Sequence, residues 1–128
     1  DVGQTEVVFT VSAEKKYKLR RDQIRALVPR RGACLATDAI LVHGAPVGFM
    51  FRAAPRDEVD SGWHFFSGYE TQAYVDDPSN MALYDVNTVA NYDPTIIPFL
   101  DAPPGSAFER DDEVGFVPVP YPDDPDDA

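Results

Sequence analysis

From Ala33 onward the chain is a series of short apolar runs, each separated from the next by turn-forming or polar residues. The runs read ACLA, AILVHG, PVGFMF and WHFF. Such short runs, with period-two spacing and many β-branched or aromatic residues, are typical of β-strands. We therefore expect them to be neighbouring strands of an antiparallel sheet, with a turn at HGAP (43–46) and an exposed acidic loop in RAAPRDEVDSG.

Helical patterns occur in other segments. In KLRRDQIRALVP, apolar residues recur near helical spacing until the final proline, which predicts a short, basic, amphipathic helix. Asp85 is expected to cap a second short helix, and Asp93 with Pro94 is expected to begin a third. Pro98 limits this third helix to little more than one turn.

The chain is long enough for one domain and too short for two. Its 128 residues are 44% hydrophobic, which is enough apolar material for a single core. A strand over Thr5–Val11 and a last hairpin that begins near Ala107 complete an α+β domain with one mainly antiparallel sheet and a few short helices. We divide the chain into an N-terminal strand and extension at 1–16, the domain at 17–119, and an acidic, proline-rich tail at 120–128 that is expected to be disordered.

The formal net charge is −11, and it is unevenly placed along the chain. Residues 1–56 hold ten of the eleven Lys and Arg residues with five acidic ones, whereas residues 57–128 hold one Arg and the other 17 of the 22 acidic residues. Repulsion argues against nucleic acid or an anionic membrane as the partner. The acidic half suits a cationic partner, unless the two halves pack together and neutralise each other. Since there is no apolar stretch of about 18 residues and no signal-peptide pattern, a cytoplasmic protein is expected.

Residue types that commonly carry out catalysis lack the spacing of the usual active-site motifs. No glycine-rich nucleotide loop, G-x-S-x-G elbow or H-E-x-x-H motif occurs, and the acidic segment from Asp76 does not fit a calcium loop. Cys34 is the only cysteine, which excludes an intrachain disulfide, and it is expected to be a small buried apolar residue. His43 and His64 lie on separate runs, so no metal site and no cofactor is expected.

The segment SGWHFFSG and the acidic loops around it are the candidate binding region. Core packing is expected for Phe65 and Phe66, whereas an exposed ring beside the acidic loops would be typical of an interface anchor. The candidate partner-binding residues are therefore Asp57, Glu58, Asp60, Trp63, Tyr69, Tyr74, Asp76 and Asp77.

Three longer segments resemble a bacterial family. GACLATDAILVHGAPVGFMFR, DSGWHFFSG and YDVNTVANYDPTIIPFLDAPPGSAFER resemble immunity protein family 33 of polymorphic toxin systems, in the family's order and at similar distances, from Tyr17 to Val119. The resemblance implies an α+β protein that protects its producer by binding and inhibiting a toxin, with no reaction of its own. The residues that match the family's characteristic motifs are Asp60, Trp63, Asp93, Asp101 and Arg110.

The residues themselves agree with this kind of function. A small acidic domain without a recognisable active site is suited to docking on a cationic protein surface, and complementary charge would speed the association. We therefore predict a non-catalytic immunity protein whose acidic loops, at 57–60 and 76–77, face a basic cognate toxin. The alternatives are a stand-alone regulatory or structural binding module, and a carboxylate-dependent hydrolase that uses Asp93 or Asp101.

Overall fold

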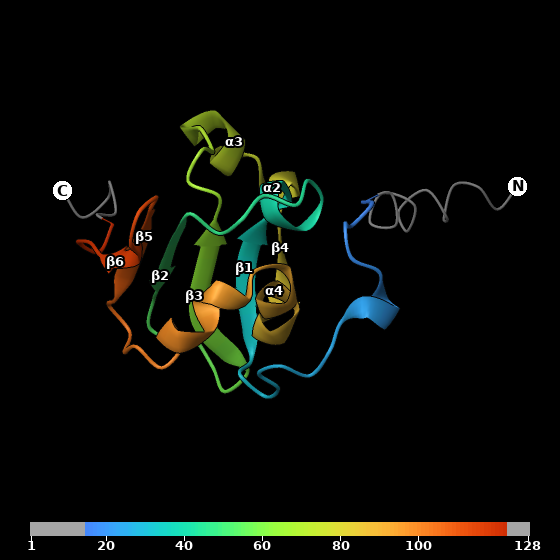
Figure 1. The fold of residues 1–128 in the computed structure, drawn as a ribbon, viewed down its shortest axis with the longest axis horizontal. Helices are drawn as coiled ribbons and strands as arrows, with labels where there is room; N and C mark the ends of the chain where they lie inside the picture. The colour runs from blue at the N-terminus through green and yellow to red at the C-terminus, as the bar shows by residue number, and fades with distance from the viewer. Residues whose placement is uncertain (1–14, 123–128) are drawn as a thin grey trace, which may run out of the picture.

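A computed structural model describes residues 15–122, which form one six-stranded sheet with short helices (Figure 1). The strands are β1 (Ala33–Thr37), β2 (Phe49–Arg52), β3 (Asp60–Phe66), β4 (Met81–Asp85), β5 (Ala107–Asp111) and β6 (Gly115–Pro118). Their order across the sheet is β4-β1-β3-β2-β5-β6; β1 and β3 are parallel, and every other neighbouring pair is antiparallel. The α+β class with one mainly antiparallel sheet is therefore confirmed.

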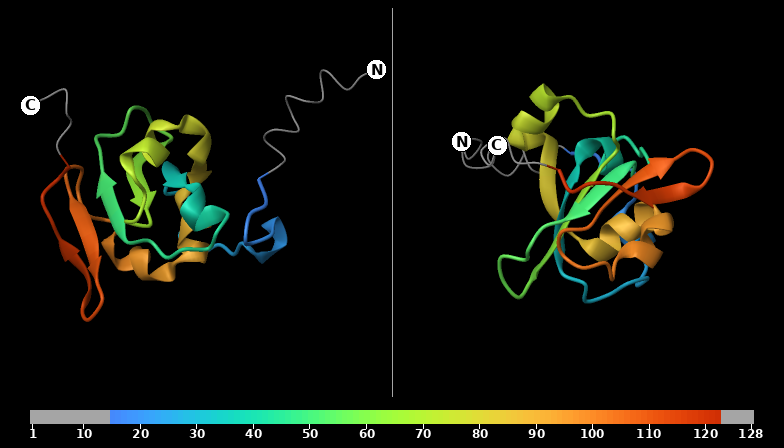
Figure 2. Two further views of the ribbon diagram at one scale, coloured as in Figure 1. Left: turned by 90° about the horizontal axis from the view of Figure 1, so that it is seen from above. Right: turned by 90° about the vertical axis from the view of Figure 1, so that its left-hand side faces the viewer.

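The helices are short, and most of them lie against one face of the sheet. They are α2 (Asp38–Leu41), α3 (Gln72–Asp76) and α4 (Val86–Tyr92), with the 3-10 turns η1 (Arg21–Gln23), η2 (Pro78–Asn80) and η3 (Pro94–Phe99). In Figure 2, α2, α4 and η3 lie on one side of the sheet, whereas α3 lies towards the other side. The predicted strand at Thr5–Val11 and residues 123–128 of the predicted tail lie outside the described residues.

Two predicted helix starts are confirmed. The Asp85 carboxylate accepts a hydrogen bond from the backbone N–H of Asn87 at 2.9 Å and so caps α4. The Asp93 carboxylate accepts from the backbone N–H of Thr95 at 3.1 Å, with Pro94 as the first residue of η3. Both caps satisfy N–H groups that a helix leaves without an internal partner.

The hydrophobic core lies between the sheet and the helices α2, α4 and η3. Trp63 and Phe65 of β3 point into it with Met50 of β2, and none of these side chains is more than 2% exposed. The Trp63 indole N–H donates to the carbonyl oxygen of Leu100 at 3.3 Å, so its polar atom is satisfied inside the core. Each fully buried side chain of this size stabilises the fold by about 1.5–3 kcal/mol.

The helix predicted in KLRRDQIRALVP is wrong, because only the short turn η1 forms there. The segment instead runs beside α4, whose asparagines satisfy its backbone. Asn87 Oδ1 accepts from the N–H groups of Leu27 and Val28, both at 2.8 Å. The side-chain amides of Asn87 and Asn91 both donate to the carbonyl oxygen of Arg25, each at 2.8 Å. These bonds replace the intrahelical bonds that the apolar spacing alone predicts.

The strand predicted in AILVHG is also wrong, because this run forms α2. Ile40 and Leu41 both face the core, which a helical turn permits and a strand does not, since neighbouring strand residues point to opposite faces. The predicted turn at 43–46 is present and follows α2: Gly44 adopts φ +79°, and its N–H donates to the carbonyl oxygen of Ile40 at 3.0 Å.

The order of the remaining elements departs from the prediction at one edge of the sheet. The acidic loop expected at 76–77 is instead the junction between α3 and η2, and the strand β4, which was not predicted, follows them. β4 lies at the sheet edge, where Leu83 is exposed, so its sequence shows no clear alternation. The exposed loop before β3 and the final hairpin β5–β6 agree with the prediction.

Candidate functional site

The sheet face opposite α2, α4 and η3 carries a cluster of half-buried aromatic rings, which we call the aromatic floor. It consists of Phe49 and Phe51 from β2 and His64 and Phe66 from β3. The Phe51 ring stacks on His64, with 4.5 Å between the ring centroids, and lies 5.9 Å from Phe66. Phe49 lies 6.0 Å from Phe66. The floor arises because alternate residues of paired strands point to the same face.

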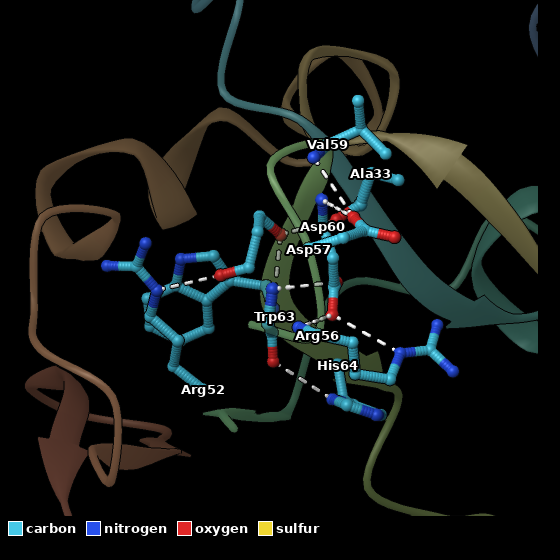
Figure 3. Close-up of polar contacts among 10 residues, drawn as sticks. Ala33, Arg52, Arg56, Asp57, Val59, Asp60, Trp63 and His64 are labelled. Atoms are coloured by element: carbon cyan, nitrogen blue, oxygen red, sulfur yellow. Dashed lines mark hydrogen bonds and ion pairs between the residues drawn. The ribbon is translucent and has the colours of Figure 1, made fainter. Parts of the chain in front are cut away.

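One end of the floor is bounded by the loop at 53–59. A cavity of about 220 Å³ lies at this end, lined by residues of the loop and of β1, β3 and β4: Leu35, Ala53, Ala54, Arg56, Asp60, Trp63, His64 and Leu83. Asp60 fixes the loop: its carboxylate accepts from the backbone N–H groups of Arg56 and Gly62, both at 2.9 Å (Figure 3). These two backbone hydrogen bonds lower the pKa of Asp60.

The other end of the floor is bounded by α3 and the turn before it. Here Phe49, Phe51 and Phe66 line a second cavity, of about 310 Å³, with Gly68, Glu70, Val75, Glu109 and Pro122. The Glu70 carboxylate holds the turn by accepting from the Thr37 hydroxyl at 2.6 Å and the Ser67 N–H at 2.8 Å. Burial raises the pKa of Glu70, but these hydrogen bonds outweigh it, so the net pKa is lowered.

The predicted partner-binding residues form two groups, one at each end of β3, and not one patch. Asp57 and Glu58 lie in the loop before β3, and Asp60 is its first residue; Tyr69, Tyr74, Asp76 and Asp77 follow the strand. Tyr69 is 91% exposed, whereas Tyr74 is half-buried. Three of the aspartates hold local backbone: Asp57 accepts from the Val59 N–H at 3.0 Å, Asp60 acts as described above, and Asp77 accepts from the Ser79 N–H at 3.0 Å.

Two aromatic residues face the opposite way from the prediction. Trp63 is 2% exposed and belongs to the core, so the structure contradicts its assignment as an exposed anchor. Phe66, expected in the core, lies on the aromatic floor instead. The alternation along β3 is regular: Trp63 and Phe65 face the core, whereas His64 and Phe66 face the aromatic floor.

The aromatic floor itself was not among the predicted site residues. The signal that could have found it is the period-two alternation in PVGFMF and WHFF, which separates Phe49 and Phe51 from Met50, and His64 and Phe66 from Phe65. Without knowing which face the helices cover, this alternation does not tell which set of side chains is left uncovered.

His64 gives the floor a pH dependence. Burial lowers its pKa below the usual 6.5, and Asp60 and Arg56 are the charged groups that act on it. The unfolded chain therefore binds a proton at a pH where the folded protein does not. The free energy of unfolding should fall as the pH drops from 6.5 towards the folded-state pKa of His64.

We expect His64→Gln to reduce this dependence of the unfolding free energy on pH, measured in urea titrations between about pH 7 and 5. The exposed His43, changed to Gln, is the control; an equal slope in wild type and His64→Gln would contradict the prediction.

Burial raises the pKa of the Cys34 thiol, which keeps it protonated and unreactive. Within residues 15–122, no three His, Cys, Asp or Glu side chains come close enough together to hold a metal ion. Over the same residues, no helix is long and apolar enough to cross a membrane.

Comparison with known proteins identifies the family. The family model described as the Immunity protein Imm33 domain matches residues 34–119, which include all six strands except the first residue of β1. No curated protein and no solved structure matches the chain. Because the model covers well over half of the sequence, the chain belongs to the Imm33 immunity protein family.

Proposed function

We propose that this protein neutralises a cognate toxin by binding it, without catalysing a reaction, and that the toxin docks on the aromatic floor. The observation that carries the proposal is the floor itself: rings from β2 and β3 cluster on the sheet face away from α2, α4 and η3. Aromatic side chains surrounded by polar groups are frequent hot spots of protein interfaces.

Charge around the floor supports a basic toxin. Glu58 stands in the loop at one end, and Asp76 of α3 stands at the other; both are exposed. Most of the bases lie in residues 15–56, many of them in the segment that runs beside α4, which packs on the opposite face of the sheet. Exposed carboxylates beside the floor would orient an approaching basic protein.

The test begins with the partner and continues with its affinity. A tagged copy of the protein, expressed in its native bacterium, is expected to capture one near-equimolar protein with a toxin-like domain, identified by mass spectrometry. Phe51→Ala should then weaken the affinity by about tenfold to a hundredfold in calorimetry. Val114→Ala is the matched control, because this exposed apolar residue lies at the tip of the β5–β6 hairpin, away from the floor.

The acidic residues at the two ends of the aromatic floor are tested separately, with residues whose side chains do not bind backbone N–H groups. Reversal of Asp57, Asp60 or Asp77 would disturb backbone that these residues fix, so Glu58→Lys and Asp76→Lys are the informative changes. Each is expected to slow association and to reduce its dependence on salt. Unchanged affinity in Phe51→Ala and in both reversals would show that the toxin docks elsewhere. Capture of no toxin-like partner would favour the stand-alone binding module.

A further inference from the structure

We infer that the cavity at the α3 end of the aromatic floor receives an arginine side chain of the protein partner. The inference rests on the proposed function and specifies the chemistry of one contact within it. The cavity has a volume of about 310 Å³, and its lining combines three phenylalanine rings and two carboxylates, from Phe49, Phe51, Phe66, Glu70 and Glu109.

The apolar part of the lining fits the body of such a side chain. Phe51 and Phe66 lie nearly parallel, with 16° between their ring planes, so they offer ring surface on which a planar cation can stack. Val75 of α3 and Pro122 complete the apolar wall, which suits the methylene stem of a long basic residue. Tyr121 packs edge-on against Phe51, with 5.4 Å between the ring centroids.

The charged part of the lining lacks a base to neutralise it. Glu70 is held as a carboxylate by its hydrogen bonds, and its Oε1 accepts only from the Gly68 N–H, at 3.0 Å, among the described residues. Glu109 is exposed on β5 and lies opposite Phe49 in the strand register. No Lys or Arg from residues 15–122 lines this cavity.

The nearest base along β5 is already engaged. Arg110 points to the other face of the sheet, where it pairs with Asp93 at 2.6 Å. The cavity at the opposite end of the floor differs in this respect, because Arg56 lines it together with Asp60. Only the α3 end therefore combines an aromatic wall with carboxylates that no base of the described chain balances.

Arginine suits this lining better than lysine does. A guanidinium is planar, stacks on aromatic rings, and can donate to two carboxylates at once, whereas an ammonium is a compact and more strongly hydrated charge. The proposed contact places the guanidinium between the Phe51–Phe66 rings and the carboxylates of Glu70 and Glu109.

The experiment needs no toxin. We would titrate ¹⁵N-labelled protein with N-acetyl-arginine methylamide, and in parallel with the citrulline analogue, which has nearly the same shape and no charge. The arginine amide should give saturable shifts at the amides of Gly68, Val75 and Glu109, with the millimolar affinity usual for a single side chain. The citrulline amide should bind about tenfold more weakly or worse. No saturable shift at these amides, or equal affinity for the two probes, would overturn the inference.

A matched pair of variants assigns the charge. Glu109→Gln should weaken binding of the arginine amide about threefold to tenfold, and Glu113→Gln, at the exposed tip of the same hairpin, should leave it unchanged. Because the probe is not the toxin, the two proposals fail separately. If Phe51→Ala weakens toxin binding while the arginine amide does not bind, only this inference falls. If the amide binds while Phe51→Ala leaves toxin affinity unchanged, only the docking face falls.

Discussion

Asp93→Ala should destabilise the protein by about 3–5 kcal/mol, because it removes a buried carboxylate that caps η3, accepts from the Val47 N–H and pairs with the half-buried Arg110. The Asp93 side chain is 8% exposed, and its Oδ2 accepts from Arg110 Nη2 at 2.6 Å and from the Val47 N–H at 2.9 Å. Arg110 in turn donates from Nε to the Val47 carbonyl oxygen at 2.8 Å, and its guanidinium lies 4.4 Å from the centre of the Phe116 ring. One carboxylate thus joins η3, the segment before β2, and β5.

Urea denaturation of Asp93→Ala and Asp101→Ala gives the comparison. Asp101 pairs with Arg31 on the surface, where its side chain is 85% exposed, so its loss should cost no more than about 1 kcal/mol. A domain of this kind is stable by about 5–15 kcal/mol, so Asp93→Ala should lose much of its folded population. Equal stability of the two variants would show that the contacts of Asp93 stabilise the fold no more than an exposed ion pair does.

This result also bears on the hydrolase alternative. Asp93 is fully occupied as a helix cap and ion-pair partner, so loss of an activity in Asp93→Asn would not identify a catalytic group. Asp101→Asn is the cleaner test, because the exposed Asp101 can be changed with little effect on folding.

Gly62→Ala should also destabilise the protein by at least about 3 kcal/mol, from backbone strain and a steric clash together. Gly62 has φ +85°, and a Cβ at this position would lie 2.1 Å from the carbonyl oxygen of Ala53. That contact is to backbone, so a side-chain rotation cannot relieve it. Gly62 also accepts from the Ala53 N–H at 2.8 Å, and its own N–H donates to Asp60, so the clash would break the base of the loop at 53–59.

Gly115→Ala separates the two causes. Gly115 has a similar φ of +87°, but a Cβ there would meet no atom within 4 Å. Its cost should therefore be the conformational strain alone, about 1–2 kcal/mol. If thermal and urea unfolding gave the same loss of stability for both variants, the clash with the Ala53 carbonyl oxygen would contribute nothing to the cost of Gly62→Ala.

The sequence alone was sufficient to predict those features of the structure that depend on residues close together in the chain. Asp85 and Asp93 cap helices through backbone N–H groups two residues away, so their residue type and position predicted both helix starts. The final hairpin followed from its two apolar segments and the polar turn between them. The family resemblance rested on sequence motifs, and the family model confirmed it over residues 34–119.

Tertiary structure decided what depends on residues far apart in the chain. Asn87 and Asn91 replaced a helix in the N-terminal segment by binding backbone about 60 residues earlier, which no local pattern shows. The parallel pairing of β1 with β3 and the edge position of β4 likewise join segments separated by long stretches of chain. Local alternation could tell that Phe51 and Met50 face opposite ways, but only the placement of α2, α4 and η3 decided which face became core. Helix packing against a sheet depends on residues far apart in the chain. The binding surface proposed here is the sheet face that those helices leave uncovered, so the local sequence could not identify it.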